Sequence, residues 1–320
     1  MPKTVMLDAE TTNPGDLSWD WLKEYGELEI YPRTPKELIL KRCENADTVI
    51  TNKTPLEKDD LEKMPNLKFV AVLATGYNVV DTAYLKQRNI PVSNIPSYST
   101  QAVAQLVFAH ITEFYNAVSL HSNDVKNGGW NRCPDFCYQL SPLTELCGKT
   151  IGIIGFGKIG QAVADIAEAY KMNILAVSGH KTEQTGRKNF RWSTLDELAC
   201  KSDIVTLHCP LTEKTEKIIN ADFLSKMKPT ALLINTARGG AVDEQALADA
   251  LNSGKIAGAG VDVLSTEPPK ADNPLLNAKN CNITPHIAWA AYETRERLMQ
   301  ILKNNVQAFF DGTPINVVNN

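Results

Sequence analysis

The stretch IGIIGFGKIGQAVA, residues 151–164, decides the fold of this 320-residue chain. An apolar, β-branched run leads into three glycines, Gly155, Gly157 and Gly160, and a helical pattern follows them. The first glycine allows a tight turn, the second lets a pyrophosphate approach the backbone, and the third lets the helix pack close to the strand. A glycine triplet alone can be a structural turn. Between a strand and a helix it predicts a dinucleotide-binding unit.

Strands and helices continue to alternate beyond this unit. Helical patterns such as KIGQAVADIAEAY and DEQALADALNSG separate short apolar runs. Six strands with helices between them predict a complete doubly wound Rossmann domain. The predicted strands are residues 150–154, 174–177, 204–208, 231–235, 257–261 and 282–284.

The flanking segments complete the predicted architecture. Residues 1–99 show the same alternation, which predicts a second parallel sheet, of the flavodoxin-like type. One long helix is expected to begin at Ser99 or Thr100 and to break at the glycine pair 128–129. The final helix cannot form a domain alone, so we expect it to pack back on the first segment. The predicted fold is therefore α/β, with an NAD(P)-binding Rossmann domain (100–291) inserted in a discontinuous flavodoxin-like substrate domain (1–99 and 292–320).

Composition excludes several classes of protein. With 43% hydrophobic and 22% charged residues, the chain is typical of a soluble globular protein. The formal net charge of -4 excludes a basic field, so we expect a small-molecule ligand, and neither nucleic acid nor a membrane as partner. No apolar run is long enough for a signal peptide or a membrane helix, which predicts a cytoplasmic protein. The seven cysteines are scattered, and Cys133 and Cys137 lack metal-ligand spacing, so neither a disulfide framework nor a metal site is expected.

The second strand of the predicted Rossmann domain lacks an expected acid. A carboxylate usually ends this strand and binds the adenosine ribose. Here the strand ends in LAVSGHK, and Ser178 and Gly179 take the place of the carboxylate. A 2'-phosphate then meets no like charge, which favours NADP(H) over NAD(H) by a small margin. The alternative is a solvated loop on an enzyme that uses NAD(H) without the acid. The cations that could reach a 2'-phosphate are His180, Lys181, Arg187 and Lys188.

Ionisable residues follow three later strands of the same domain. Arg238 follows the fourth strand, and His286 follows the sixth. Asp262 and Glu267 follow the fifth. Because ligands bind at the carboxyl ends of parallel strands, these side chains are expected to converge. A guanidinium can bind a substrate carboxylate and polarise a ketone, and an imidazole beside a carboxylate can protonate the developing alkoxide. Each residue alone could be a surface charge or a cap. Together they predict hydride transfer to a 2-keto acid by an Arg-Glu-His triad.

Five motifs, in this order, resemble the D-isomer-specific 2-hydroxyacid dehydrogenase family over essentially the whole chain. They are GIIGFGKIG, VTLHCPLTEKTEKIIN, LLINTARGGAVDEQAL, GAGVDVLSTEP and NITPHIAWA. The resemblance implies that His286 is the catalytic acid/base, that Glu267 is its partner and that Arg238 is both catalytic and substrate-binding. Many members carry Asp where this chain has Ser178. The other implied substrate-binding residues are His286 and, through backbone amides, Thr75, Gly76 and Tyr77. Beside the three glycines and residues 178–181, the implied cofactor contacts are Lys158, Ile159, His208, Cys209, Pro210, Thr236, Ala237, Arg238, Asp262 and His286.

Two further motifs, LATGYNVVD and TPHIAWAAYETRERLM, resemble the glycerate dehydrogenases, also called hydroxypyruvate reductases. This resemblance implies reduction of hydroxypyruvate or glyoxylate, to D-glycerate or glycolate, with NADH or NADPH. It also implies a homodimer with contacts from residues 100–147. Trp289 favours a small polar substrate if it points into the site, and otherwise packs on the core or a partner. The alternatives are a D-lactate dehydrogenase or broad 2-keto acid reductase and, in another class, a dinucleotide-sensing, corepressor-like binding protein.

Overall fold

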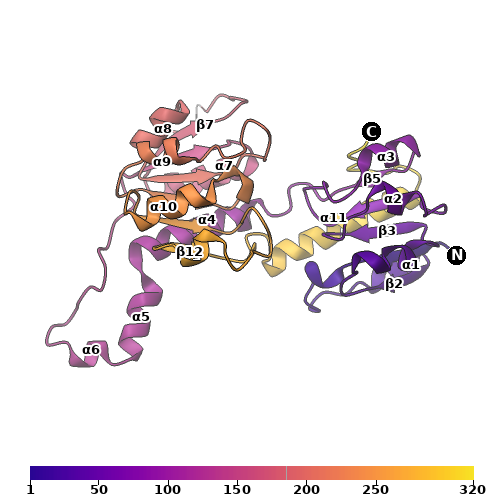
Figure 1. Cartoon of the computed structure of the whole chain (residues 1–320), viewed down its shortest axis with the longest axis horizontal. Helices are drawn as coiled ribbons and strands as arrows, with labels where there is room; N and C mark the ends of the chain where they lie inside the picture. The colour runs from indigo at the N-terminus through magenta and orange to yellow at the C-terminus, as the bar shows by residue number, and fades with distance from the viewer. Residues whose placement is uncertain (185) are drawn as a thin grey trace. The chain divides into compact units, whose positions relative to one another are not determined.

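The chain forms two compact units in the computed structural model, which describes residues 1–184 and 186–320 (Figure 1). The first unit comprises Met1–Tyr98 and Ala290–Asn320, and the second comprises Ser99–Trp289. These boundaries lie close to the breaks predicted after residues 99 and 291. Each unit is built on one parallel sheet with helices packed against it, so the predicted α/β fold class is confirmed.

The first unit contains a five-stranded sheet in the order β2-β1-β3-β4-β5, with every pair parallel. This is the strand order of flavodoxin-like folds. The central strands are covered on both faces, which is why runs such as TVIT and FVAV consist of apolar and β-branched residues. The strands are β1 (Lys3–Met6), β2 (Glu27–Ile30), β3 (Thr48–Thr51), β4 (Phe69–Val72) and β5 (Val92–Ser93). The α-helices are α1 (Ile39–Cys43), α2 (Lys58–Leu61), α3 (Thr82–Gln87) and α11 (Tyr292–Phe310).

Helix α11 and the tail after it complete the first unit. The ring of Phe309 stacks on Phe69 of β4, with the ring centroids 4.5 Å apart. The buried Asn305 donates from Nδ2 to the carbonyl oxygen of Asn94 at 2.9 Å. Beyond the helix, the backbone N–H of Val318 donates to the carbonyl of Val92 in β5. The last helix of the sequence therefore packs on the sheet formed by the first segment.

Two arginines of α11 hold the points where the chain leaves the first unit. Arg297 donates from Nε to the carbonyl of Tyr98, and Arg295 donates from Nε to the carbonyl of Ala290, each at 3.0 Å. Arg295 is only 7% exposed. A buried guanidinium needs a paired charge, and Asp16 supplies it through two hydrogen bonds of 2.5 and 2.6 Å.

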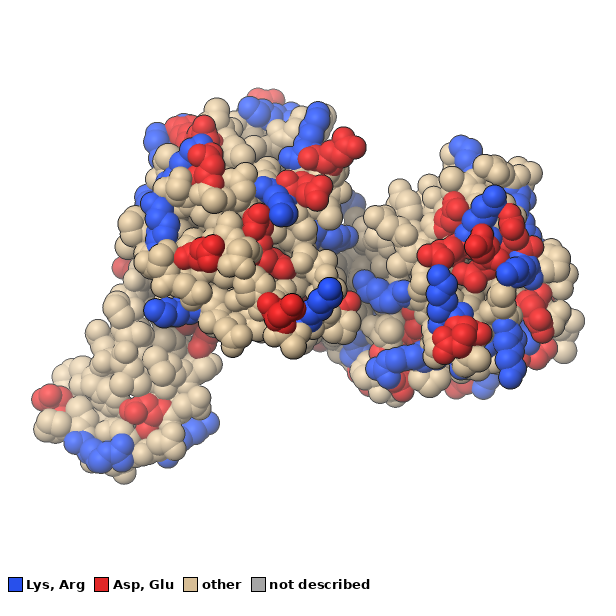
Figure 2. Space-filling view, viewed as in Figure 1, with Lys and Arg blue, Asp and Glu red and all other residues tan. Residues whose placement is uncertain are grey.

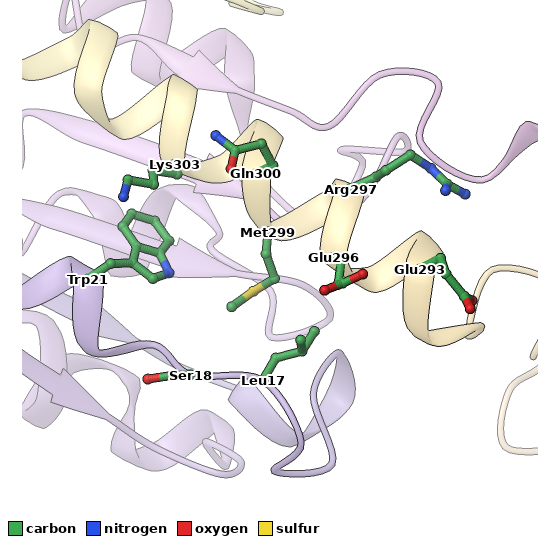
Figure 3. Close-up of a pocket in the computed structure, with 9 residues that line it drawn as sticks. All are labelled: Leu17, Ser18, Trp21, Glu293, Glu296, Arg297, Met299, Gln300 and Lys303. Carbon is green, nitrogen blue, oxygen red and sulfur yellow. The ribbon is translucent and has the colours of Figure 1, made fainter.

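An open groove of about 610 Å³ lies between residues 17–21 and α11 (Figure 3). Leu17, Trp21 and Met299 form its apolar lining. The Nζ atom of Lys303 lies 5.9 Å from the centroid of the Trp21 ring. None of the residues that line this groove belongs to the predicted site.

The second unit contains a seven-stranded parallel sheet in the order β12-β11-β10-β9-β6-β7-β8. The chain enters at β6, moves to one edge, and then crosses to build the other half, which is the doubly wound arrangement. Every predicted strand of this domain lies within one residue of its expected bounds. These strands are β6 (Thr150–Ile154), β7 (Asn173–Val177), β9 (Ile204–Leu207), β10 (Leu232–Asn235), β11 (Gly258–Val261) and β12 (Cys281–Ile283).

The seventh strand, β8 (Phe190–Trp192), was not predicted from the sequence. It has three residues with Arg191 in the middle, which is too short for a period to be recognised. Its aromatic rings pack on Phe156 of the glycine loop, with centroids 4.9 Å (Phe190) and 5.4 Å (Trp192) from that ring. Tertiary contacts from a distant loop therefore stabilise this edge strand.

Helices cover both faces of the second sheet. One face packs against α4 and α7, through residues such as Val107 and Val163. The other packs against α8, α9 and α10, through Leu198, Leu224 and Leu247. In the part of the chain that the structure describes, no helix is long and apolar enough to cross a membrane. The helices on the two faces are α4 (Thr100–Asn116), α7 (Lys158–Ala169), α8 (Leu195–Lys201), α9 (Ala221–Lys226) and α10 (Glu244–Asn252).

The prediction of one long helix up to residue 128 is wrong, because the helix breaks at Ala117. This residue has a left-handed backbone, with φ +45°, and it ends α4. The break is held by hydrogen bonds on both sides: Ala117 N–H donates to Glu113 O at 2.8 Å, and His121 N–H donates to Ala117 O at 3.1 Å. Helices α5 (Val118–Lys126) and α6 (Gly129–Arg132) then extend away from the sheet of this unit (Figure 1).

Residues 118–143, here named the arm, expose an unusual number of apolar side chains. Phe136 is 88% exposed, Val118 63% and Trp130 51%. Leu120, Leu140 and Leu143 are also exposed. In Figure 2 much of the visible arm is uncharged, whereas acidic and basic side chains are mixed over the visible faces of both units. An apolar patch of this kind marks an interaction surface.

Candidate active site

The glycine loop has the three features that its sequence predicts. Gly155 adopts φ +94°, and a Cβ atom there would lie 2.5 Å from the backbone of His208 and Cys209. A Cβ on Gly160 would lie 2.3 Å from the carbonyl oxygen of Gly155, so this glycine allows the helix to pack on the turn. Gly157 is the N-cap of α7 and has no atom within 4 Å of its Cβ position. The loop is therefore closed behind Gly155 and Gly160 and open in front of Gly157.

The first turn of α7 faces this open side. Lys158 and Gly157 are exposed and Ile159 is half-buried. The first N–H groups of a helix have no partner within it and carry a partial positive charge. This turn can accept the pyrophosphate of a dinucleotide.

Two buried polar atoms lie at the carboxyl ends of the neighbouring strands β9 and β10. His208 Nε2 lies 2.9 Å from Thr206 Oγ1, but His208 Nδ1 has no hydrogen-bond partner within residues 1–184 and 186–320. Thr236 Oγ1 is likewise buried and without a partner there. Burial lowers the pKa of His208 to about 3, so the ring is neutral. Buried polar groups are nearly always hydrogen-bonded, so these atoms fit a polar ligand at this edge.

The residues beside these atoms surround the glycine loop. Cys209 is buried, and its backbone lies against Gly155. Pro210 is exposed, and its carbonyl accepts a hydrogen bond from Thr215 Oγ1 at 2.6 Å. After β10, the N–H of Ala237 donates to Asn235 Oδ1 at 3.0 Å. The residues predicted to contact a cofactor after β6, β9 and β10 thus share one edge of the sheet.

In the loop after β7, where the expected acid is missing, Ser178 is half-buried and residues 179–181 are exposed. Ser178 Oγ accepts a hydrogen bond from the N–H of His180 at 3.3 Å, and Gly179 has open space around it. The Nζ atom of Lys181 lies 5.9 Å from the centroid of the Trp192 ring. Both residues line a surface pocket of about 480 Å³.

Arg187 is not available as a phosphate-binding cation. Its guanidinium forms ion pairs with Asp165 and Glu168 on α7 and donates to the carbonyl of Gln161. The Arg187 side chain is only 12% exposed. The expectation that it contributes to a 2'-phosphate site is therefore not supported, because two acids of α7, 19 and 22 residues earlier in the chain, already neutralise it. Lys188 is exposed.

His286 and Glu267 form the central pair of the site. His286 Nδ1 lies 2.6 Å from Glu267 Oε2, and both side chains are about one-third exposed (32% and 35%). The other carboxylate oxygen, Oε1, accepts a hydrogen bond from the N–H of Leu264 at 3.0 Å. Because an ionised carboxylate only accepts, Nδ1 carries a proton, and Nε2 is the ring nitrogen left for other chemistry.

The backbone of His286 is held in an uncommon conformation, with φ +54°. The buried carboxylate of Asp262 accepts from Thr284 Oγ1 at 2.6 Å and from the N–H groups of Ile287 and Ala288 at 2.9 and 2.8 Å. The N–H of His286 donates to the carbonyl of Asp262 at 2.8 Å. A left-handed non-glycine residue persists only where its surroundings determine it, and Asp262 does so here.

His110 supports this arrangement and was missed by sequence reasoning. Its Nε2 lies 3.3 Å from Thr284 Oγ1, and the residue is 6% exposed on α4. Burial lowers the pKa of His110, opposed by the charge of Asp262. The only signal in the sequence was a polar residue within a helical pattern. Sequence alone cannot tell whether such a residue is buried or faces solvent.

Arg238 follows the strand next to β11 in the same sheet. It is exposed, and Nη1 donates to the carbonyl of Ala237 at 2.7 Å. A Cβ on Gly239 would lie 1.9 Å from the backbone of Leu264, so the turn after Arg238 packs directly on the loop that carries Glu267. The structure therefore joins His286 to Glu267 and places Arg238 at the end of the adjacent strand.

The predicted carboxylate-binding turn lies in the first unit, after β4. Thr75, Gly76 and Tyr77 are exposed. Thr75 Oγ1 donates to the carbonyl of Ile95 at 2.8 Å, and Asn94 Nδ2 donates to the carbonyl of Thr75 at 2.8 Å. Among the described residues of this unit, none accepts a backbone hydrogen bond from the amides of the three turn residues.

Known proteins are similar to this chain over its whole length. The family model for the NAD binding domain of the D-isomer specific 2-hydroxyacid dehydrogenases matches residues 108–288. A hydroxypyruvate reductase of Blautia hydrogenotrophica is 50% identical over 320 residues, with 99% of each chain covered. A glycerate dehydrogenase of Methylorubrum extorquens is 41% identical, with 99% of this chain and 98% of the relative covered. A crystal structure of an NADPH-dependent glyoxylate/hydroxypyruvate reductase from Sinorhizobium meliloti, with NADP and malonate, has a TM-score of 0.84 at 31% identity and covers 99% of this chain and 96% of its own.

A fold and a site of this kind are those of an NAD(P)-dependent oxidoreductase. More narrowly, the chain belongs to the D-isomer-specific 2-hydroxyacid dehydrogenase family. The resemblance to the glycerate dehydrogenase and hydroxypyruvate reductase branch is also confirmed.

Proposed function

We propose that this enzyme reduces hydroxypyruvate to D-glycerate and glyoxylate to glycolate, with NAD(P)H as the hydride donor. The observation that supports this most is the 2.6 Å pair of His286 and Glu267 at the sheet edge where Arg238 also stands. Two relatives similar over the full chain carry the corresponding names. They do not favour the alternatives of a D-lactate dehydrogenase, a broad 2-keto acid reductase or a corepressor-like binding protein.

In this proposal the chain's own residues bind the acid and move one proton. Bound NAD(P)H supplies the hydride for the keto carbon. His286 gives a proton from Nε2 to the keto oxygen, since Nδ1 faces Glu267. Glu267 fixes the orientation of the ring through the hydrogen bond to Nδ1. Arg238 binds the substrate carboxylate and polarises the ketone.

The turn after β4 is proposed to contribute to substrate binding. Thr75, Gly76 and Tyr77 are exposed, and their amides have no backbone acceptor among the described residues of the first unit. Successive free N–H groups of this kind bind carboxylates. We therefore propose that the first unit is the substrate domain and the second the cofactor domain.

We propose that the dinucleotide lies along the carboxyl edge of the second sheet. The open face of Gly157 supports this placement, as do the buried atoms His208 Nδ1 and Thr236 Oγ1, which have no hydrogen-bond partner among the described residues. Asp262 already binds Thr284 and two amides, so any cofactor contact shares its oxygens with them. The proposed contacts are Gly155, Gly157, Lys158, Ile159, Gly160, Ser178, Gly179, His180, Lys181, His208, Cys209, Pro210, Thr236, Ala237, Arg238, Asp262 and His286.

The proposed cofactor preference is for NADP(H), by a small margin. Ser178 and Gly179 bring no negative charge, and Lys181 is exposed beside them. Ser178→Asp is expected to lower the ratio of kcat/KM for NADPH to that for NADH by about tenfold or more, because the carboxylate repels a 2'-phosphate and accepts from a 2'-hydroxyl. Asp222→Asn, a remote surface variant, is the control. An unchanged ratio in Ser178→Asp means that this loop does not select the cofactor.

The test of the proposed function is a panel of keto acids with NADH and NADPH. Hydroxypyruvate or glyoxylate is expected to give the highest kcat/KM. His286→Gln is expected to lose about 10²- to 10⁴-fold in kcat, far more than it loses in cofactor affinity, since proton transfer is removed while the other proposed cofactor contacts remain. Highest activity with pyruvate supports the D-lactate dehydrogenase instead. Tight cofactor binding with no oxidation across the panel supports the binding protein.

We propose a homodimer in which the arm forms part of the interface. Exposed Trp130 and Phe136 support this, because apolar patches of this kind favour a protein partner. Light scattering at micromolar concentration is expected to give the dimer mass for the wild type and the monomer mass for Phe136→Asp. A monomeric wild type refutes the proposal.

Action in the cytoplasm also stays a prediction, to be checked by fractionation of cells.

A further inference from the structure

One carboxylate holds both ends of the loop that carries Glu267. Glu244, at the start of α10, accepts through Oε1 from the N–H of Ser265 at 2.7 Å. Through Oε2 it accepts from Ser265 Oγ at 2.8 Å and from Asn273 Nδ2 at 2.9 Å. Ser265 precedes Glu267 and Asn273 follows it. The two oxygens of Glu244 therefore close the loop at its base.

Glu244 is itself well placed to hold the loop still. The helix behind it is capped by Asp243, whose side chain accepts from the N–H of Ala246, and it is anchored by the fully buried Leu247. Asn273 is also fixed at its other end, where Oδ1 accepts from the N–H of Leu275 at 3.0 Å. Hydrogen bonds to an ionised carboxylate are among the strong ones in proteins.

The closed base lies directly beside the groups that fix Glu267. Glu267 Oε1 accepts from the N–H of Leu264, the residue before Ser265. The turn after Arg238 packs on the same backbone, because Gly239 leaves no room for a Cβ against Leu264 and Ser265. A shift of Ser265 therefore moves the N–H of Leu264 that binds Glu267 Oε1. It also moves the backbone on which the turn after Arg238 packs.

We infer that Glu244 is a positioning residue for the Glu267–His286 pair. Its hydrogen bonds go to Ser265 and Asn273, and it acts through these two residues. Its carboxylate keeps Glu267 Oε2 at hydrogen-bond distance from His286 Nδ1. This inference rests on the proposed acid/base role of His286. The alternative is a purely structural role, in which Glu244 only stabilises the loop against unfolding.

The test compares Glu244→Ala and Ser265→Ala with Asp272→Asn. Asp272 lies in the same loop, is exposed, and has no hydrogen bond or ion pair in the described structure, so it is the matched control. In Glu244→Ala, kcat for hydroxypyruvate is expected to fall about tenfold or more, because small misplacements of catalytic groups cost up to about 10²-fold. Cofactor Kd is expected to stay within about twofold of wild type, since the glycine loop is untouched. Ser265→Ala removes one of the three hydrogen bonds to Glu244, so its kcat is expected to fall less than that of Glu244→Ala.

The split between kcat and KM separates positioning from stability. When Glu267 is displaced, the imidazole that gives the proton is misplaced, so in Glu244→Ala kcat is expected to fall far more than KM for hydroxypyruvate rises. An unchanged kcat, with only a lower thermal midpoint, overturns the inference. Asp272→Asn is expected to keep the kcat and KM of the wild type.

A second readout needs no turnover. The Nδ1–H proton of His286, assigned with His286→Gln, is expected to give a downfield NMR resonance in the wild type because of its short hydrogen bond to the carboxylate. Glu244→Ala is expected to weaken or shift this resonance, and Asp272→Asn to leave it unchanged. An unchanged resonance in Glu244→Ala overturns the inference even if the enzyme reduces none of the keto acids, so its failure is distinct from failure of the proposed function.

Discussion

His286 Nδ1 and Glu267 Oε2 lie 2.6 Å apart, although the two residues leave the sheet from different strands. Glu267→Gln keeps an oxygen that can accept from Nδ1–H but replaces a charge-assisted hydrogen bond with a weaker neutral one. The ring is then held less firmly, so we expect kcat for keto acid reduction to fall by about 10- to 100-fold. Steady-state kinetics check this. A kcat equal to that of the wild type contradicts the role of the charge.

Two alanine substitutions in the glycine loop are expected to act on different properties, one on cofactor affinity and the other on stability. The methyl group of Gly157→Ala enters open space, and φ at this residue is an ordinary -79°, so the thermal midpoint is expected to stay unchanged. Cofactor Kd is expected to rise about tenfold, because the methyl group occupies the path by which the pyrophosphate approaches. Gly160→Ala meets the carbonyl of Gly155 and is expected to lose about 1–3 kcal/mol of stability. Calorimetry and cofactor titration check both. Wild-type affinity in Gly157→Ala would place the pyrophosphate elsewhere.

Removing the hydroxyl of Thr284 should loosen the backbone of His286. Thr284→Val keeps the shape but removes the 2.6 Å hydrogen bond to Asp262, which is worth about 1.5–3 kcal/mol as a bond to a charged group. We expect a fall in kcat of about tenfold or more. His110→Leu, which loses only the 3.3 Å contact, is expected to have a smaller effect in the same direction. Equal and unchanged kcat values in the two variants would falsify this account.

Burial of a neutral His208 makes stability fall in acid. Its pKa is about 3 in the folded protein and 6.5 in an exposed chain, so below 6.5 the unfolded state binds a proton that the folded state does not. The free energy of unfolding therefore decreases as pH falls from 6.5 toward 3. His208→Gln is expected to show a smaller fall in thermal midpoint between about pH 7.5 and pH 5 than the wild type. The exposed His180→Gln is the control and should behave as wild type. An equal fall in all three proteins shows that His208 does not contribute.

The strands of the second unit could be predicted because each is a short apolar run between turn residues. Runs such as IGII and LLIN are buried on both faces, and this requirement leaves a clear pattern in the sequence. Strand β8 leaves no such pattern, since its stability comes from rings that pack on Phe156. The break at Ala117 was missed for a related reason, because alanine favours helix and only its surroundings hold it in a left-handed conformation.

The candidate site was predictable where residues follow a strand end and not where they support others from a distance. His286, Glu267 and Arg238 lie within six residues of a strand end, so parallel topology brings them to one edge. Glu244 and His110 act through hydrogen bonds to residues far along the chain, and no local pattern indicates such partners. Arg187 shows the opposite error. It lies close in sequence to the loop after β7, but Asp165 and Glu168 of α7 already neutralise its charge.

The first unit combines residues 1–98 with residues 290–320, so the second unit is synthesised between its two segments. Residues 99–289 leave the ribosome before α11, whose Phe309 covers Phe69 and whose Arg295 and Arg297 hold the two connections. The second unit can therefore fold while the five-stranded sheet still exposes apolar surface. A nascent chain that stalls before residue 290 thus presents chaperones with a finished domain joined to an unfinished one.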